Sequence, residues 1–163
     1  MIIQVTSGKG SGPTTLAAFD SALLDAGVAN YNLIKLSSIV PPNVKVVETK
    51  RRKLRLPGGW GDRLYVVMAD AREDIHNTEA WAAVGWAQDE KTGKGLFAEH
   101  IGAYKATVQQ NVVDSIIAFA KNRRMKIGPV RMKIEGIKCG KESVCALVVA
   151  VFGSDDWKKI EVV

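Results

Sequence analysis

The order of strand-like and helix-like segments is the feature that most limits how this chain can fold. Runs rich in apolar and β-branched residues predict strands, and only two stretches show helical periodicity. The predicted strands span 2–6, 31–36, 63–69, 80–88, 96–102, 130–137 and 144–152, and the predicted helices span 15–27 and 103–123. We expect strands 80–88 and 96–102 to form one hairpin, and strands 130–137 and 144–152 to form a closing hairpin. This order favours an α+β fold of sheets covered by helices.

Two connecting stretches are predicted as loops. "SGKGSGPTT" (7–15) is glycine-rich and leads into the first helix, but its lysine stands between the glycines, so it is not a Walker phosphate-binding motif. Residues 41–62 form a second predicted loop, rich in proline, glycine and basic residues. Thr14 and Gly27 are predicted to cap the two ends of the first helix.

Composition indicates one globular domain over residues 1–163, with 47% hydrophobic and 25% charged residues. No apolar run reaches the roughly 18 residues of a membrane span, and the N-terminus has no signal-peptide pattern, so a cytoplasmic protein without a membrane partner is expected. Cys139 and Cys145 are too few for a disulfide framework and match no zinc spacing. They are predicted to be buried thiols, and no metal site is expected.

The formal net charge of +6 raises the question of a nucleic-acid partner. The basic residues are densest in "KRRKLR" (50–55) and "KNRRMK" (121–126). Neither segment has interleaved aromatic residues for base stacking, and no RNA-binding or zinc-finger spacing occurs. These segments are therefore interpreted as a solvated basic surface, in preference to a nucleic-acid binding site.

Asp20 is a carboxylate in an unexpected position on the first predicted helix. A helical wheel places it in one sector with Leu16, Phe19, Leu23 and Leu24. A carboxylate on a buried stripe is costly unless a cation or several donors meet it. Two readings stay open at this point: a structural ion pair, and a pocket acid that receives a cationic ligand.

Glu99 has a similar character on a predicted strand. Strict alternation places it between Phe97 and Ile101 on one face, so it lies either at a sheet edge or in a pocket. In a pocket it would be suited to proton transfer. His100, on the other face, is read as a satisfied core histidine or as a catalyst.

The stretch "NLIKLSSIVPP" (32–42) carries two serines on a segment that two prolines make stiff. A serine hydroxyl held against the preceding carbonyl can attack it and form an ester. Elimination at that serine then leaves dehydroalanine, which hydrolyses to a pyruvoyl group and ammonia. Such chemistry needs an immobile backbone and a donor for the oxyanion. The pair Ser37 and Ser38 could undergo this chemistry, and Asn32 is the candidate donor.

The flanks of this segment make the interpretation specific. The run "TLAAFDSALLDAGVANYNLIKLSSIVPP" (15–42) closely resembles the self-cleaving segment of pyruvoyl-dependent arginine decarboxylases. "GLFAEHIG" (95–102) resembles that family's glutamate-bearing segment. The resemblance covers about residues 2–120 in order and spacing, and it weakens through the C-terminal strands.

The resemblance implies a fold and a processing event. The fold would be an αββα layered sandwich of the pyruvoyl-dependent histidine/arginine decarboxylase type. Cleavage between Ser37 and Ser38 would give a β chain of residues 1–37 and an α chain of residues 38–163. Ser38 would become the covalent pyruvoyl cofactor. The protomers would assemble as a homotrimer, alone or paired into a hexamer, with active sites between subunits.

The resemblance also implies a reaction, in which a carboxy-lyase converts L-arginine to agmatine and CO2 through a Schiff base, as in polyamine biosynthesis. Glu99 would protonate the α-carbon once the pyruvoyl group exists, and Asp20 would hold the guanidinium group. Two alternatives remain. Ala29 and Tyr31 depart from the family pattern near the pocket, which leaves another amino-acid substrate open. The second alternative is an unprocessed homologue that binds a cationic ligand or nucleic acid.

Overall fold

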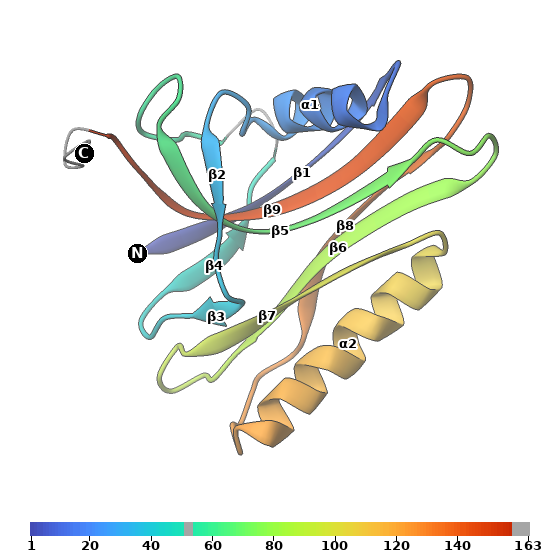
Figure 1. Cartoon of the computed structure of the whole chain (residues 1–163). Coiled ribbons are helices and arrows are strands. Elements are labelled where there is room, and N and C mark those ends of the chain that lie inside the picture. Colours follow the sequence, from blue (N-terminus) through green and yellow to red (C-terminus); the bar gives the residue numbers. More distant parts are fainter. Residues whose placement is uncertain (51–53, 158–163) are drawn as a thin grey trace.

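The structure, a computed structural model, describes residues 1–50 and 54–157 and has four layers (Figure 1). The elements in chain order are β1 (Ile2–Gly12), α1 (Thr15–Ala26), β2 (Asn32–Lys35), β3 (Ile39–Val40), β4 (Lys45–Glu48), β5 (Arg63–Glu73), β6 (Glu79–Gln88), β7 (Gly95–Gly102), α2 (Lys105–Asn122), β8 (Arg131–Lys138) and β9 (Ser143–Asp155). A five-stranded sheet and a four-stranded sheet stack face to face, with α1 outside the first and α2 outside the second (Figure 1). The predicted αββα sandwich is confirmed.

The five-stranded sheet has the order β2-β5-β9-β1-β4, and the four-stranded sheet has the order β3-β7-β6-β8. In the first sheet β1 pairs antiparallel with β9 and parallel with β4, while β2 pairs parallel with β5. The second sheet is antiparallel throughout. The edge strand β4 lies inside the segment predicted as a long loop, because its short alternating sequence gave too little strand signal.

The glycine-rich stretch after residue 6 is not the predicted loop, because β1 continues to Gly12. Glycine serves close packing here. A methyl group at Gly8 would lie 2.3 Å from the Ala22 carbonyl oxygen, and one at Gly10 would lie 2.5 Å from the Ala22 backbone nitrogen. The absent side chains thus let α1 rest directly on β1.

This close approach also reverses the predicted orientation of α1. The buried face of the helix is the alanine row Ala18, Ala22 and Ala26, since small side chains allow the shortest distance to the glycines. Leu16 and Leu24 are 68% and 60% exposed. The prediction that Asp20 lies on a buried stripe was therefore wrong; Asp20 is exposed on the outer side of α1.

Helix α1 begins and ends at the two cap residues predicted from the sequence. The Thr14 side chain accepts a hydrogen bond from the Ala17 backbone N–H at 3.1 Å, as an N-cap does. Gly27 ends the helix with φ 79°, in the left-handed region that favours glycine. Both predicted caps are confirmed.

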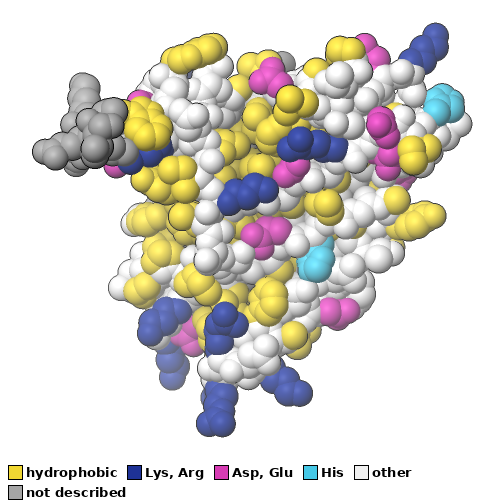
Figure 2. All heavy atoms as spheres, viewed as in Figure 1, with side chains coloured by type: hydrophobic (Ala, Val, Ile, Leu, Met, Phe, Trp, Pro, Cys, Tyr) yellow, Lys and Arg dark blue, Asp and Glu magenta, His cyan; other side chains and the backbone are white. Residues whose placement is uncertain are grey.

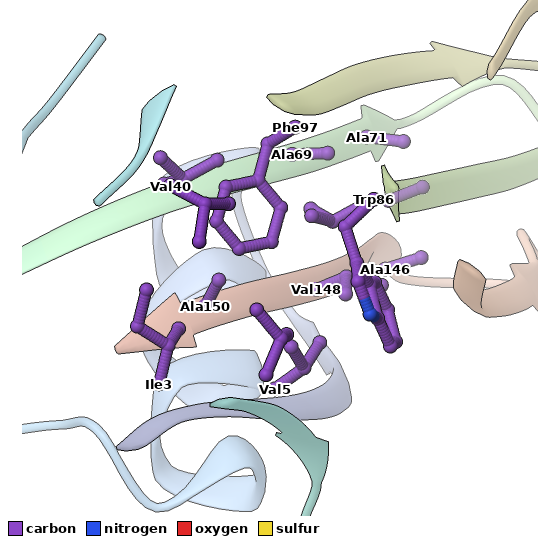
Figure 3. Packing of buried hydrophobic residues seen from close by; sticks show 14 of the residues in the cluster. Ile3, Val5, Val40, Ala69, Ala71, Trp86, Phe97, Ala146, Val148 and Ala150 are labelled. Atoms are coloured by element: carbon purple, nitrogen blue, oxygen red, sulfur yellow. The ribbon is translucent and has the colours of Figure 1, made fainter. Parts of the chain in front are cut away.

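The main hydrophobic core lies between the two sheets (Figure 3). Phe97 of β7 and Trp86 of β6 point from the four-stranded sheet toward Val5 and Val148 of the five-stranded sheet. Their ring centroids are 6.5 Å apart and tilted by 55°. This core fixes the direction of β7, and with it the position of the residues that follow Phe97.

The predicted closing hairpin was wrong, because its two strands belong to different sheets. β8 pairs with β6, whereas β9 lies between β5 and β1. Burial explains the difference. From Val144 to Val151 every residue of β9 is buried, as a central strand between two layers requires, while β8 is half-buried at an edge.

Cys139 and Cys145 are buried and unpaired, as predicted. Burial raises the pKa of the Cys145 thiol to about 12, so this sulfur stays protonated and inert. Within the described residues no helix is long and apolar enough to cross a membrane. Of the basic segment 50–55, residues 51–53 lie outside the described part of the chain.

Candidate active site

The serine pair lies where the chain passes from one sheet to the other. β2, in the five-stranded sheet, ends just before it, and β3, in the four-stranded sheet, begins just after it. The Leu36 N–H donates to the Val66 carbonyl at 2.8 Å, and the Phe97 N–H donates to the Ser38 carbonyl at 2.9 Å. Both sides of the Ser37–Ser38 bond are thus fastened to a sheet, which gives the immobile backbone that the chemistry needs.

The Ser38 hydroxyl points at the Glu99 carboxylate. Its Oγ lies 2.6 Å from Glu99 Oε1 and 2.7 Å from Oε2, so the hydroxyl donates to a charge-bearing acceptor. Glu99 is half-buried on β7, beside the short β3 that leaves most of this strand's edge uncovered. The two readings of Glu99 therefore combine, because this sheet edge is also the wall of a pocket.

The Ser37 carbonyl already receives a hydrogen bond. The Ile39 N–H donates to it at 2.7 Å, which closes a three-residue turn around Ser38. When a nucleophile attacks that carbonyl carbon, the oxygen gains negative charge, and a donor already in place stabilises it. A hydroxyl, a neighbouring carboxylate and a polarised carbonyl are the groups that an internal acyl shift requires.

Asn32, the predicted oxyanion donor, is placed differently. It begins β2, is exposed, and donates its side-chain N–H to the Gly61 carbonyl. Its backbone N–H donates to the Asp62 carbonyl at 2.8 Å. The structure therefore joins Asn32 to the segment before β5, and the donor at Ser37 is a backbone group that no side-chain pattern could reveal.

A pocket of about 420 Å³ opens beside Ser38 and Glu99. Its far wall is α2, which contributes Ser115, Phe119 and Arg123. His100 of β7 also lines the pocket, and its Nε2 lies 2.7 Å from Ser115 Oγ, so its ring is hydrogen-bonded to α2. The three α2 residues were missed as site residues. The one available signal was polar Ser115 beside the apolar stripe of the helix.

Asp20 is not part of this pocket. It lies on α1, which covers the outer side of the five-stranded sheet (Figure 1). The pocket is lined instead by residues of the serine segment, β7 and α2. Within one chain the structure brings together Ser37, Ser38 and Glu99, and it leaves Asp20 and Asn32 outside that group.

Comparison with known proteins gives a consistent result. The family model of pyruvoyl-dependent arginine decarboxylase matches residues 2–156. The chain is 31% identical over 147 residues to pyruvoyl-dependent arginine decarboxylase 2 of Archaeoglobus fulgidus, covering 90% of this chain and 92% of the relative. It is 33% identical over 162 residues to the Halobacterium salinarum enzyme (94% and 95% covered). With the Methanocaldococcus jannaschii enzyme it shares 49% identity over 103 residues (61% and 58%).

Proposed function

Because the chain belongs to the pyruvoyl-dependent arginine decarboxylase family, we propose that it cleaves itself at Ser37–Ser38 and then converts L-arginine to agmatine and CO2. The enzyme's cofactor is a covalent pyruvoyl group, and Ser38 is its proposed source. The observation that carries the proposal is the hydrogen bond from Ser38 Oγ to both oxygens of Glu99.

Self-cleavage begins when Ser38 Oγ attacks the Ser37 carbonyl carbon. Glu99 receives the hydroxyl proton, and the Ile39 N–H stabilises the charge on the carbonyl oxygen. The peptide nitrogen leaves and takes up a proton, which completes an ester between Ser37 and the Ser38 side chain. Loss of the Ser38 α-proton then expels the Ser37 carboxylate. The remaining dehydroalanine takes up water and releases ammonia, so the new α chain begins with the pyruvoyl group.

In the mature enzyme the pyruvoyl group supplies the carbonyl and the electron sink for decarboxylation. Glu99 lies against the atoms from which this group forms, and its task is to return a proton to the substrate α-carbon after CO2 leaves. Phe119 and Ile39 line the adjacent pocket and give it an apolar surface beside the reacting atoms. His100, fixed by Ser115, orients the opposite wall.

Asp20 is proposed to hold the guanidinium group of a substrate bound at a neighbouring subunit. Exposed leucines, Leu16 and Leu24, flank it one helical turn away on each side. Ile39 and Ile101, beside Ser38 and Glu99, are also exposed, at 47% and 56%. Apolar side chains exposed at both places support a homotrimer in which Asp20 of one protomer completes the pocket of the next.

A cytoplasmic location is part of the proposal. The two cysteines are buried thiols, which fits a reducing compartment. Arginine, a small amino acid, is the proposed partner, and the site has no stacked aromatic surface of the kind that binds nucleic-acid bases.

Two serine variants test the proposed function. Ser38→Ala should give one intact chain on a denaturing gel and no agmatine, because it removes the nucleophile. Ser37→Ala is the matched control; it should still cleave, since Ser37 contributes only its carbonyl. The wild type should give two fragments and should prefer arginine over lysine, ornithine, histidine and aspartate in a CO2-release assay. Cleavage of Ser38→Ala would refute the processing step, and preference for another amino acid would refute the substrate.

A further inference from the structure

Four basic side chains surround one depression at the C-terminal end of α2. The depression has a volume of about 490 Å³ and is lined by Asp89, Thr92, Lys94, Arg123, Arg124, Met125 and Lys126. Lys94 comes from the turn between β6 and β7, and the other three cations come from the end of α2 and the residues after it. Figure 2 shows basic side chains gathered at this lower end of the molecule. Two separate elements thus present positive charge to the same space.

Cations outnumber acidic groups in this cluster. In the described part of the chain the ion pairs join other residues, and none includes Lys94, Arg123, Arg124 or Lys126. Asp89, the one carboxylate in the lining, is turned into its own loop. Its Oδ1 accepts the Thr92 backbone N–H at 2.7 Å and the Thr92 hydroxyl at 2.8 Å. These bonds, led by the one from the Thr92 backbone, lower the pKa of Asp89.

Arg124 has a left-handed backbone conformation, which is unusual for a residue with a long side chain. Its φ is 50°, in the left-handed region, directly after the helix C-cap at Arg123. This position normally carries glycine, as Gly27 shows at the end of α1. The other described non-glycine residues with positive φ are asparagines, which tolerate it. An arginine here costs stability that glycine would not, so the charge serves something other than folding.

We propose that this basic pocket binds a small polyphosphate, such as the di- or triphosphate group of a metabolite. Several converging cations match closely spaced phosphate charges, and two of them are arginines, which can hold phosphate oxygens in pairs. A nucleic acid is disfavoured because no aromatic ring lines the depression.

The pocket is connected to the candidate active site through one residue. Arg123 lines both depressions, and its Nη1 donates to the Phe119 carbonyl at 3.2 Å. A cation at the wall of the active site opposes the guanidinium of arginine. A bound polyphosphate neutralises that charge, so KM for arginine should fall when the anion binds. This coupling rests on the proposed function, whereas the binding itself does not.

The test is calorimetric titration of the purified wild-type protein with inorganic tripolyphosphate. Binding should weaken as salt is raised from about 50 to 200 mM, because the contacts are ionic. Arg124→Gly should lower the affinity at least about 5-fold, since one charged contact is lost. The same variant should raise Tm by about 2–4 °C, because glycine relieves the left-handed position. If Arg124 instead stabilised the fold, Arg124→Gly would lower Tm.

Lys138→Gln is the matched control, an equal loss of charge at the exposed end of β8. It should bind tripolyphosphate as the wild type does, and Arg123→Gln should bind it more weakly. Absence of binding by the wild type, or equal weakening in the Lys138 variant, would overturn the site. Tighter binding of a single-stranded oligonucleotide would overturn the ligand class. An unchanged KM for arginine in saturated protein would overturn the coupling and leave the binding result intact.

Discussion

Glu99 lies beside Ser38 while the Ser37–Ser38 bond is intact, so the proposed mechanism gives one carboxylate two tasks at different times. In the precursor it accepts the hydrogen bond of the nucleophile, at 2.6 and 2.7 Å. In the proposed mechanism the same group later returns a proton to the substrate carbon. The resemblance to the family had suggested the later task alone, and the hydrogen bond supports the earlier one as well.

Glu99→Gln should therefore slow both steps. The amide cannot take the Ser38 proton, so self-cleavage should lag behind that of the wild type in a gel time course. Once cleaved, the variant should lose about 10²–10⁴-fold in kcat, the usual contribution of a general acid. Glu135→Gln is the matched control, because Glu135 also accepts a serine hydroxyl, Ser7 Oγ at 2.8 Å, but lies outside the pocket. Unimpaired cleavage by Glu99→Gln would confine Glu99 to the later task.

Asp20→Asn tests the guanidinium contact. The change keeps the shape of the side chain and removes its charge, so kcat/KM for arginine should fall by about 30- to 4,000-fold, the equivalent of about 2–5 kcal/mol. Citrulline, which has no charge to leave unpaired, should be affected far less. Asp25→Asn is the control on the same helix, where the carboxylate accepts the Lys9 backbone N–H at 2.9 Å. An equal loss for both substrates would assign Asp20 a structural role.

The residues of the candidate site differed in how far the sequence could identify them. Ser37, Ser38 and Glu99 lie in segments whose spacing carries the chemistry, and the structure brings them together. The Ile39 N–H had no signature, because every residue except proline carries the same group. Arg123 was assigned to solvated surface, since its place beside the pocket depends on how α2 packs on β7.

At the scale of elements, the packing of α1 on β1 depends on residues with little or no side chain. Helical-wheel reasoning assigned the buried face to the largest apolar residues. The structure instead buries a row of alanines that faces the glycines of β1. Close contact between the two backbones brings more atoms together than a few leucines could if they held the helix away from the sheet. Strand prediction failed at the same place, since glycine carries no alternation of polar and apolar side chains.

Gly10→Ala should show how tight this contact is. A methyl group there would lie 2.5 Å from the Ala22 backbone nitrogen and 2.7 Å from the Ala18 carbonyl oxygen, so α1 must shift. We expect a loss of about 1–3 kcal/mol in the free energy of unfolding. Urea unfolding in the Ser38→Ala background, where the chain stays whole, measures it. Gly140→Ala is the control, because nothing lies within 4 Å of the added methyl group; similar losses in both variants would contradict tight packing.

At the scale of the whole molecule, the proposed cleavage divides the chain without dividing the fold. The 37-residue fragment (1–37) contains β1, α1 and β2, and the 126-residue fragment (163 − 37) contains the remaining elements. β1 lies between β9 and β4, both of which belong to the larger fragment. The smaller piece therefore supplies an inner strand, β1, and an edge strand, β2, of the five-stranded sheet.

The two fragments should stay together in native buffer. Gel filtration of the processed enzyme should give one peak that contains both chains in equal amounts, and a denaturing gel of that peak should resolve them. The interlocked strands give the reason, since removing β1 exposes the core between the sheets. Loss of the small fragment on dilution would mean that β1 contributes far less than its position implies.

If the chain is cleaved as proposed, the inner position of β1 makes refolding harder after maturation than before it. While the chain is whole, β1 finds β9 at the high effective concentration that a covalent tether provides. After the cut, a molecule that unfolds releases two pieces, which must meet again by diffusion at the far lower concentration of the protein itself. Denatured precursor should then refold at a rate independent of dilution, and denatured mature enzyme should not. An active molecule that unfolds thus regains its fold at a rate that depends on its concentration, a dependence that the tethered precursor does not have.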